Sequence, residues 1–101
     1  MKYRIVYSDR ASNDFRELYR VIAHDYGEPQ TAFHYTQGLI DTINSLKTYP
    51  TAHAVRNNHS LLKFGFNVRR VNYKKIAIIY TIHDDVVFIR RIIAGSLISD
   101  K

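Results

Sequence analysis

Apolar residues recur at three- and four-residue steps through most of the first half of the chain, the spacing of one face of an α-helix. The first stripe follows a short apolar run at residues 3–8, interpreted as a strand, and Ser8 or Asp9 is placed to cap the helix. Gly27 predicts its end, and Pro29 predicts a new first turn. The stripes are Ala11, Phe15, Leu18, Ile22 and Tyr26, then Ala32, Thr36, Leu39, Ile40, Ile43 and Leu46. Because the link is short, we expect an antiparallel helix hairpin.

The second half has the composition of β-strands. A polar stretch without periodicity at residues 51–60 predicts a loop, and three apolar runs follow at 61–71, 74–82 and 86–95. Their connections are too short for parallel crossovers, so these strands are expected to be antiparallel. In the middle strand, alternation puts Ile76, Ile78, Tyr80 and Ile82 on the face expected to pack on the helices, and Ala77, Ile79, Thr81 and His83 on the other.

These elements predict an α+β fold in the order β-α-α-β-β-β. The helix hairpin is expected to pack on one face of a mostly antiparallel four-stranded sheet. Residues 1–101 are expected to form a single domain, because this length closes a core without disulfides or metal.

The composition excludes several kinds of chemistry. The chain has no cysteine, which rules out disulfides, zinc–thiolate sites and cysteine nucleophiles. The histidines lack paired ligand spacing, so we expect no metal, and we expect no other cofactor. Nothing approaches the roughly 20 apolar residues of a membrane span, so we expect a cytoplasmic protein without a membrane partner.

The net positive charge of the chain comes from its second half. Residues 1–50 contain six Lys and Arg and six Asp and Glu, whereas residues 51–101 contain nine of the former and three of the latter, which accounts for the net charge of +6. A basic surface on one side of a domain suits an anionic partner, either nucleic acid or an acidic protein segment.

Two arginines lie side by side in the last strand. Alternation predicts that Arg90 and Arg91 point to opposite faces, grouping Val86, Phe88 and Ile92 on one side and Val87, Ile89 and Ile93 on the other. The inward guanidinium is expected to reach the sheet edge or a helix carboxylate such as Asp14 or Glu17. The outward one is expected on a face that no segment of this chain covers, and an exposed face that is both apolar and cationic is typical of a partner site.

The order of elements, with "YRIVYS", "LKTYP" and "NVRRVNYKKIAIIYTIHDDVVFIRRIIAG", resembles the RelE/ParE superfamily of bacterial type II toxin–antitoxin systems. The resemblance covers nearly the whole chain and depends on several diffuse features in order. It implies a toxin that inhibits growth, serves plasmid stabilisation and is neutralised when a cognate acidic antitoxin wraps across it. A homodimer and a hetero-oligomer with the antitoxin both stay open.

The resemblance leaves the target open. ParE-like toxins inhibit DNA gyrase and so replication, whereas RelE-like toxins are ribosome-dependent mRNA endoribonucleases that inhibit translation. A metal-independent nuclease would use Arg69, Arg70, Arg91 and His83 as its catalytic residues, with Tyr80 as a substitute acid or base. The RelE-like middle-strand arginine is replaced by Ala77, and Ser96 and Leu97 stand where a C-terminal catalytic arginine is sought.

These departures favour the ParE-like reading, because gyrase inhibition requires no catalytic set. The third hypothesis is a member of the superfamily that still binds its antitoxin but is no longer toxic. In each case the surface that binds antitoxin or target is expected to be Arg69, Arg70, Lys74, Lys75, Arg90 and Arg91. The alternative for the first four of these is a solvated hairpin turn with its flanks.

Overall fold

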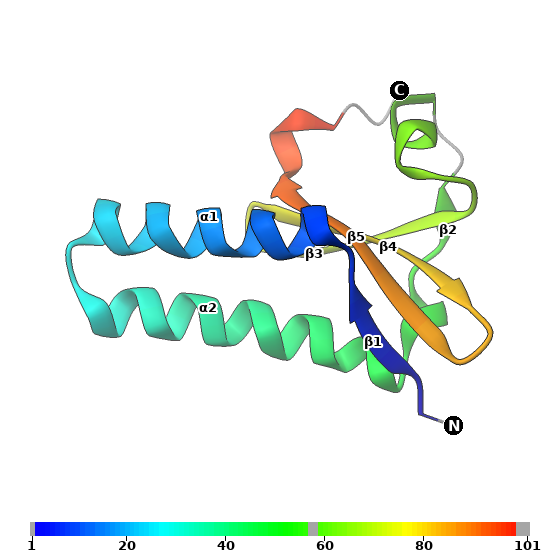
Figure 1. Cartoon of the computed structure of the whole chain (residues 1–101), viewed down its shortest axis with the longest axis horizontal. Coiled ribbons are helices and arrows are strands. Elements are labelled where there is room, and N and C mark those ends of the chain that lie inside the picture. The colour runs from blue at the N-terminus through cyan, green and yellow to red at the C-terminus, as the bar shows by residue number, and fades with distance from the viewer. Residues whose placement is uncertain (1, 57–58, 99–101) are drawn as a thin grey trace.

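The computed structural model describes residues 2–56 and 59–98 of the chain, without the side chains of Tyr26, His59 and Ser60. The helices and strands are β1 (Arg4–Tyr7), α1 (Asp9–Tyr26), α2 (Pro29–Asn44), β2 (Val55–Arg56), β3 (Val68–Tyr73), β4 (Ile76–His83) and β5 (Val86–Ala94). Short 3-10 segments lie between and after them: η1 (Ser45–Lys47), η2 (Pro50–Ala52), η3 (His59–Phe64) and η4 (Gly95–Leu97). The fold is α+β, with the two long helices beside a mixed sheet (Figure 1).

The sheet has the strand order β1-β5-β4-β3-β2. β1 pairs in parallel with β5, so the first strand lies beside the last, and the other described pairs are antiparallel. The predicted architecture is confirmed, with one strand more than expected. The extra strand is β2, two residues long, within the segment predicted to be a loop.

The predicted second strand began too early. Residues 59–64 form η3, and β3 starts only at Val68. Gly65 has a φ of 126° and Asn67 a φ of 57°, backbone conformations that break an extended strand and turn the chain back over the sheet. Leu61 and Phe64 are thereby placed three residues apart on one side of a 3-10 helix, packed against the sheet.

The helix hairpin covers one face of the sheet, as predicted. Ser8 caps α1 by accepting a hydrogen bond from the N–H of Ala11, and Gly27 ends it with a φ of 59°. The helix-side core combines residues of the predicted stripes with residues of β3, β4 and β5: Ala11, Leu39, Ile43, Leu46, Val71, Ile76, Ile78, Tyr80, Val87, Ile89 and Ile92. The side chain of Tyr26 lies outside the described part of the chain.

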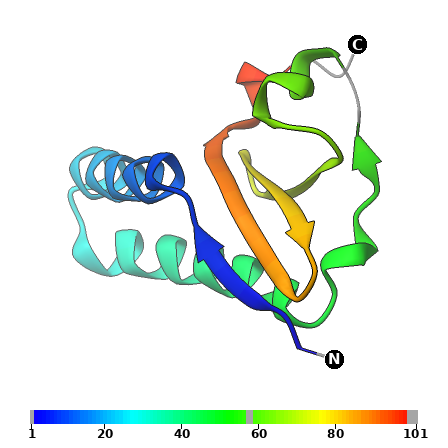
Figure 2. The same cartoon turned by 45° about the vertical axis from the view of Figure 1, so that its right-hand side comes forward.

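The opposite face of the sheet is also covered, which overturns the expectation that no segment of this chain reaches it. A second core contains Leu61, Val68, Ala77, Ile79 and Ile98, with Phe64 and Ile93 packed against it. Figure 2 shows η3 and the C-terminal segment together at the end of the sheet away from β1. Short 3-10 turns do not carry the 3.6-residue period of an α-helix, so the sequence pattern did not reveal them.

None of the described helices is long and apolar enough to span a lipid bilayer.

Candidate functional site

Strand β5 contains an irregularity at its two arginines. Ile79 of β4 lies opposite Arg91, whereas Tyr80 lies opposite Ile89, so Arg90 is an extra residue without a partner across the ladder. An extra residue of this kind forms a β-bulge and resets the alternation of side chains. The predicted grouping of β5 residues is therefore wrong: Ile92 joins Val87 and Ile89 in the helix-side core, and Ile93 packs on the other face.

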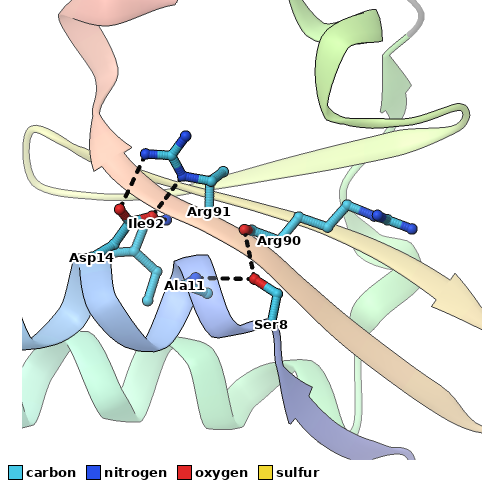
Figure 3. Close-up of polar contacts among 6 residues, drawn as sticks. All are labelled: Ser8, Ala11, Asp14, Arg90, Arg91 and Ile92. Atoms are coloured by element: carbon cyan, nitrogen blue, oxygen red, sulfur yellow. Dashed lines mark hydrogen bonds and ion pairs between the residues drawn. The ribbon is translucent and has the colours of Figure 1, made fainter.

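Ser8 fastens this bulge to the start of α1 (Figure 3). Its N–H donates to the carbonyl oxygen of Ile89 at 2.9 Å, and its Oγ donates to the carbonyl oxygen of Arg90 at 2.9 Å. The same Oγ accepts from the N–H of Ala11 at 2.9 Å. One serine thus satisfies two successive carbonyl groups of the bulge and caps the helix that begins next to it.

Asp14 of α1 holds Arg91. Its Oδ2 accepts from Nε of Arg91 at 2.7 Å and from the N–H of Ile92 at 3.0 Å, and its Oδ1 accepts from Nη2 of Arg91 at 3.1 Å (Figure 3). The Arg91 and Asp14 side chains are 21% and 16% exposed. The hydrogen bond that Arg91 donates to the Asp14 carboxylate raises the pKa of Arg91. The predicted pairing of one arginine with a helix carboxylate is confirmed, whereas Glu17 instead pairs with Arg20.

Arg90 lies on the face of the sheet away from the helices. Its Nε donates to Oγ1 of Thr81 at 3.0 Å, and its guanidinium lies 5.1 Å from the centre of the Phe88 ring. Thr81 Oγ1 is also 2.9 Å from Nε2 of His83. Arg90 is therefore positioned by a neutral hydroxyl and an aromatic ring, in contrast to the carboxylate that binds Arg91.

Two adjoining hollows, together called the cationic hollow here, lie beside these arginines; both arginines line the first, and Arg91 also lines the second. The first, of about 230 Å³, is lined by Ser8, Asp9, Arg10, Lys63, Phe64, Arg90 and Arg91. The second, of about 310 Å³, is lined by Arg10, Lys63, Phe64, Arg91, Ile93 and Leu97. Ligand pockets typically occupy about 300–1,000 Å³. The two hollows lie below and at the lower end of this range, and each has room for one or two side chains.

Arg10 and Lys63 were missing from the predicted site. They come from α1 and η3, which are far apart in sequence and meet at β5 only because η3 folds over the second face. Arg10 precedes an apolar helical stripe, and Lys63 lies in a segment predicted to be a strand. No local signal in the sequence connects the two.

Arg69 and Arg70, both in β3, do not share a site. Arg69 lies opposite Tyr80 and donates from Nη1 to the carbonyl oxygen of His53 at 2.5 Å. Arg70 points to the other face, where its Nε donates to Oδ1 of Asn72 at 2.8 Å. Arg70 also lies so close to Gly95 that a Cβ there would stand 2.8 Å from its Nη2.

The remaining predicted residues are distributed over both ends of β4. Lys74 and Lys75 form the β3–β4 turn, where the Lys74 ammonium lies 5.1 Å and 5.6 Å from the ring centres of Tyr35 and Tyr73. His83 is exposed at the opposite end of β4. It lies four residue steps along the extended strand from Ile79, the residue opposite Arg91, which is a distance of about 13 Å.

Tyr80 belongs to the core. Its hydroxyl donates to the carbonyl oxygen of Pro50 at 2.6 Å, and its side chain is fully buried. Burial disfavours the phenolate and raises the pKa of Tyr80 to about 12, with the positive charge of Arg69 acting weakly in the opposite direction. Such a group is a poor acid or base near neutral pH.

Comparison with known proteins assigns the chain to a family. The family model described as "ParE toxin of type II toxin-antitoxin system, parDE" matches residues 5–96. The chain belongs to the ParE toxin family. The resemblance to the RelE/ParE superfamily read from the sequence is thereby confirmed.

A solved structure shares the fold of this ParE-family chain. It is described as the chromosomal ParDE TA system from P. aeruginosa, with a TM-score of 0.74 and 16% sequence identity. The match covers 92% of this chain and 96% of the other. A comparison with curated proteins finds no match.

Proposed function

We propose that this ParE-family chain is a bacterial toxin that inhibits DNA gyrase by binding it, and that an acidic antitoxin neutralises the toxin. Membership of the ParE toxin family supports the toxin–antitoxin part of this proposal. The net charge of +6 supports an acidic neutralising partner. The proposed site of action is the cytoplasm, and the proposed consequence is arrested replication and growth.

The separation of the nuclease candidates is the observation that carries the gyrase assignment. RNA cleavage without metal requires a base, an acid and cationic donors around one phosphate. Arg69 is bound to a carbonyl on the helix side of the sheet, Arg91 is bound to Asp14, and His83 lies at the far hairpin. Gyrase inhibition by binding requires no such convergence.

A parallel assay of purified protein tests the assignment. The protein is added to gyrase with relaxed plasmid, and separately to a cell-free translation reaction whose mRNA ends are mapped. We expect loss of supercoiling or accumulation of linear plasmid, with translation unchanged. Cleavage of mRNA in the ribosomal A site would replace the proposal with the endoribonuclease alternative, and activity in neither assay would indicate a toxin that has lost its target.

A matched pair of histidine variants sharpens this assay. His83→Gln removes the most exposed nuclease candidate, and His24→Gln changes an exposed histidine on α1 as the control. Gyrase inhibition is expected to be the same for both variants and the parent protein. A loss of toxicity confined to His83→Gln would favour the nuclease alternative.

A further inference from the structure

Three cations of the cationic hollow have no carboxylate partner among the residues that the structure describes. Arg10, Lys63 and Arg90 come from α1, η3 and β5, and none of them forms an ion pair with a described Asp or Glu. Lys63 lies 5.2 Å from the centre of the Phe64 ring instead. Among the described residues that line the hollow, Asp9 is the one carboxylate; Asp14, which binds Arg91, is not part of the lining. The hollow therefore has an excess of positive charge.

Apolar side chains form the other wall of the same hollow. Ile93 and Phe64 are half-buried, and Leu97 is 70% exposed at the rim. An exposed leucine next to unpaired cations fits a partner that presents both aliphatic groups and negative charge. A nucleic-acid backbone supplies negative charge but leaves an aliphatic rim exposed to water.

We propose that the cationic hollow binds a segment of a protein partner that presents both carboxylates and aliphatic side chains such as leucine. A carboxylate of that segment lies between Arg10 and Lys63, within reach of Arg90, and a neighbouring aliphatic side chain covers Leu97 and Ile93. Calling this partner the antitoxin depends on the proposed function, whereas the chemistry of the segment does not. Arg91 is excluded as a main contact because Asp14 already neutralises it.

Direct binding of a defined probe tests this assignment. The probe is a fluorescent synthetic peptide of alternating Leu and Glu pairs, followed by anisotropy. Two comparison peptides replace every Glu by Gln or every Leu by Ser, and a short DNA duplex of arbitrary sequence serves as the nucleic-acid comparison. We expect the Leu/Glu peptide to bind most tightly of the four.

Variants of the hollow locate the binding. Arg10→Gln with Lys63→Gln is expected to weaken the peptide about tenfold, and Leu97→Ser several-fold, as for charged and apolar anchors at interfaces. The matched control is Lys2→Gln with Lys47→Gln, which removes the same charge from a different surface hollow beside β1. All of these side chains are exposed, so thermal melting is expected to stay close to that of the parent protein.

Each contrary outcome overturns the assignment. Equal weakening by the control pair would show unspecific charge attraction, and tighter binding of the duplex would show a nucleic-acid surface. Equal binding of the Ser-substituted peptide would remove the aliphatic contact, and absence of peptide binding would remove the site. Because the assay contains no gyrase, its outcome is independent of the gyrase assignment.

Discussion

The two faces of the sheet are covered in different ways. On one face, two long helices with regular apolar stripes pack against alternate residues of β4. On the other face, a 3-10 turn and the C-terminal segment place a few apolar side chains over Ala77 and Ile79. The first covering is built from a repeating pattern, and the second from single residues at the ends of short turns.

This difference explains why the candidate site lies on the second face. A regular helical layer buries its apolar stripe continuously, whereas short turns cover only part of a sheet and leave charged side chains at their edges. Arg10, Lys63 and Arg90 gather at such an edge. The bulge in β5 adds to this, because it directs two consecutive arginines toward the same hollow while keeping Ile92 in the helix-side core.

Shortening one buried side chain in each core is expected to give the largest difference in stability between the two faces. Ile78 and Leu61 are both fully buried, on the helix side and the second face respectively. We expect Ile78→Ala to lower the free energy of unfolding by about 4 kcal/mol, near the upper part of the range for such changes. Leu61→Ala is expected to cost about 2 kcal/mol, because a short turn can settle into the space. Urea denaturation measures both, and equal losses would contradict the proposed contrast.

Removal of Asp14 comes next in size. Asp14→Ala leaves Arg91 and the N–H of Ile92 without their acceptor, and we expect a loss of about 3 kcal/mol in the free energy of unfolding. The control is Glu17→Ala on the same helix, where an exposed pair with Arg20 contributes below about 1 kcal/mol. If chemical denaturation gave similar values for the two variants, Arg91 would not be a structural residue.

The stability of the protein at alkaline pH tests the environment of Tyr80, the buried tyrosine of the helix-side core. The pKa of Tyr80 is about 12 in the folded protein against 10.0 for an unperturbed side chain, so folding favours its protonated form. The resulting stabilisation is complete below pH 10 and is lost as the pH rises toward 12, by about 2–3 kcal/mol.

Tyr80→Phe provides the comparison for this pH dependence. The variant is expected to be less stable than the parent at neutral pH by about 1–2 kcal/mol, because the carbonyl oxygen of Pro50 loses its donor. The difference between the two proteins should shrink between pH 10 and pH 12. A constant difference across that interval would show that the hydroxyl titrates normally in the fold.

Arg90→Gln is expected to have the smallest effect on stability. Arg90 is bound by the Thr81 hydroxyl and the Phe88 ring, so its loss should change the free energy of unfolding by less than about 1 kcal/mol. Arg91→Gln should cost more, since it leaves Asp14 partly buried without its cation. Equal shifts in melting temperature for the two variants would contradict the distinction between Arg91, which stabilises the fold, and Arg90, which is available to bind a partner.

The sequence predicted the helix-side half of the molecule well. Helical stripes, Ser8 as a cap, Gly27 as an end and the alternation of Ile76, Ile78 and Tyr80 are all local patterns, and the structure confirms them. The pairing of an arginine with Asp14 was also predictable, because a guanidinium within an apolar strand needs a carboxylate nearby.

The second face was not predictable for physical reasons. Leu61 and Phe64 fit a strand as well as a 3-10 turn, and the positive φ of Asn67 depends on how the turn packs. The bulge at Arg90 has no local sequence signature, since it arises where Ser8 meets two successive carbonyl groups of β5. Arg10 and Lys63 are brought together only by these two features.

A residue-by-residue map of peptide binding tests whether the cationic hollow is the binding site. Backbone amide signals of the isotopically labelled toxin are followed by NMR during titration with the Leu/Glu peptide. We predict that the largest shifts fall on Arg10, Lys63, Arg90 and Leu97, while Lys2 and Lys47 beside β1 stay unchanged. Shifts that centre on β1 or on the outer surface of α2, with the cationic hollow unaffected, would show that the peptide binds elsewhere and would contradict the proposed site.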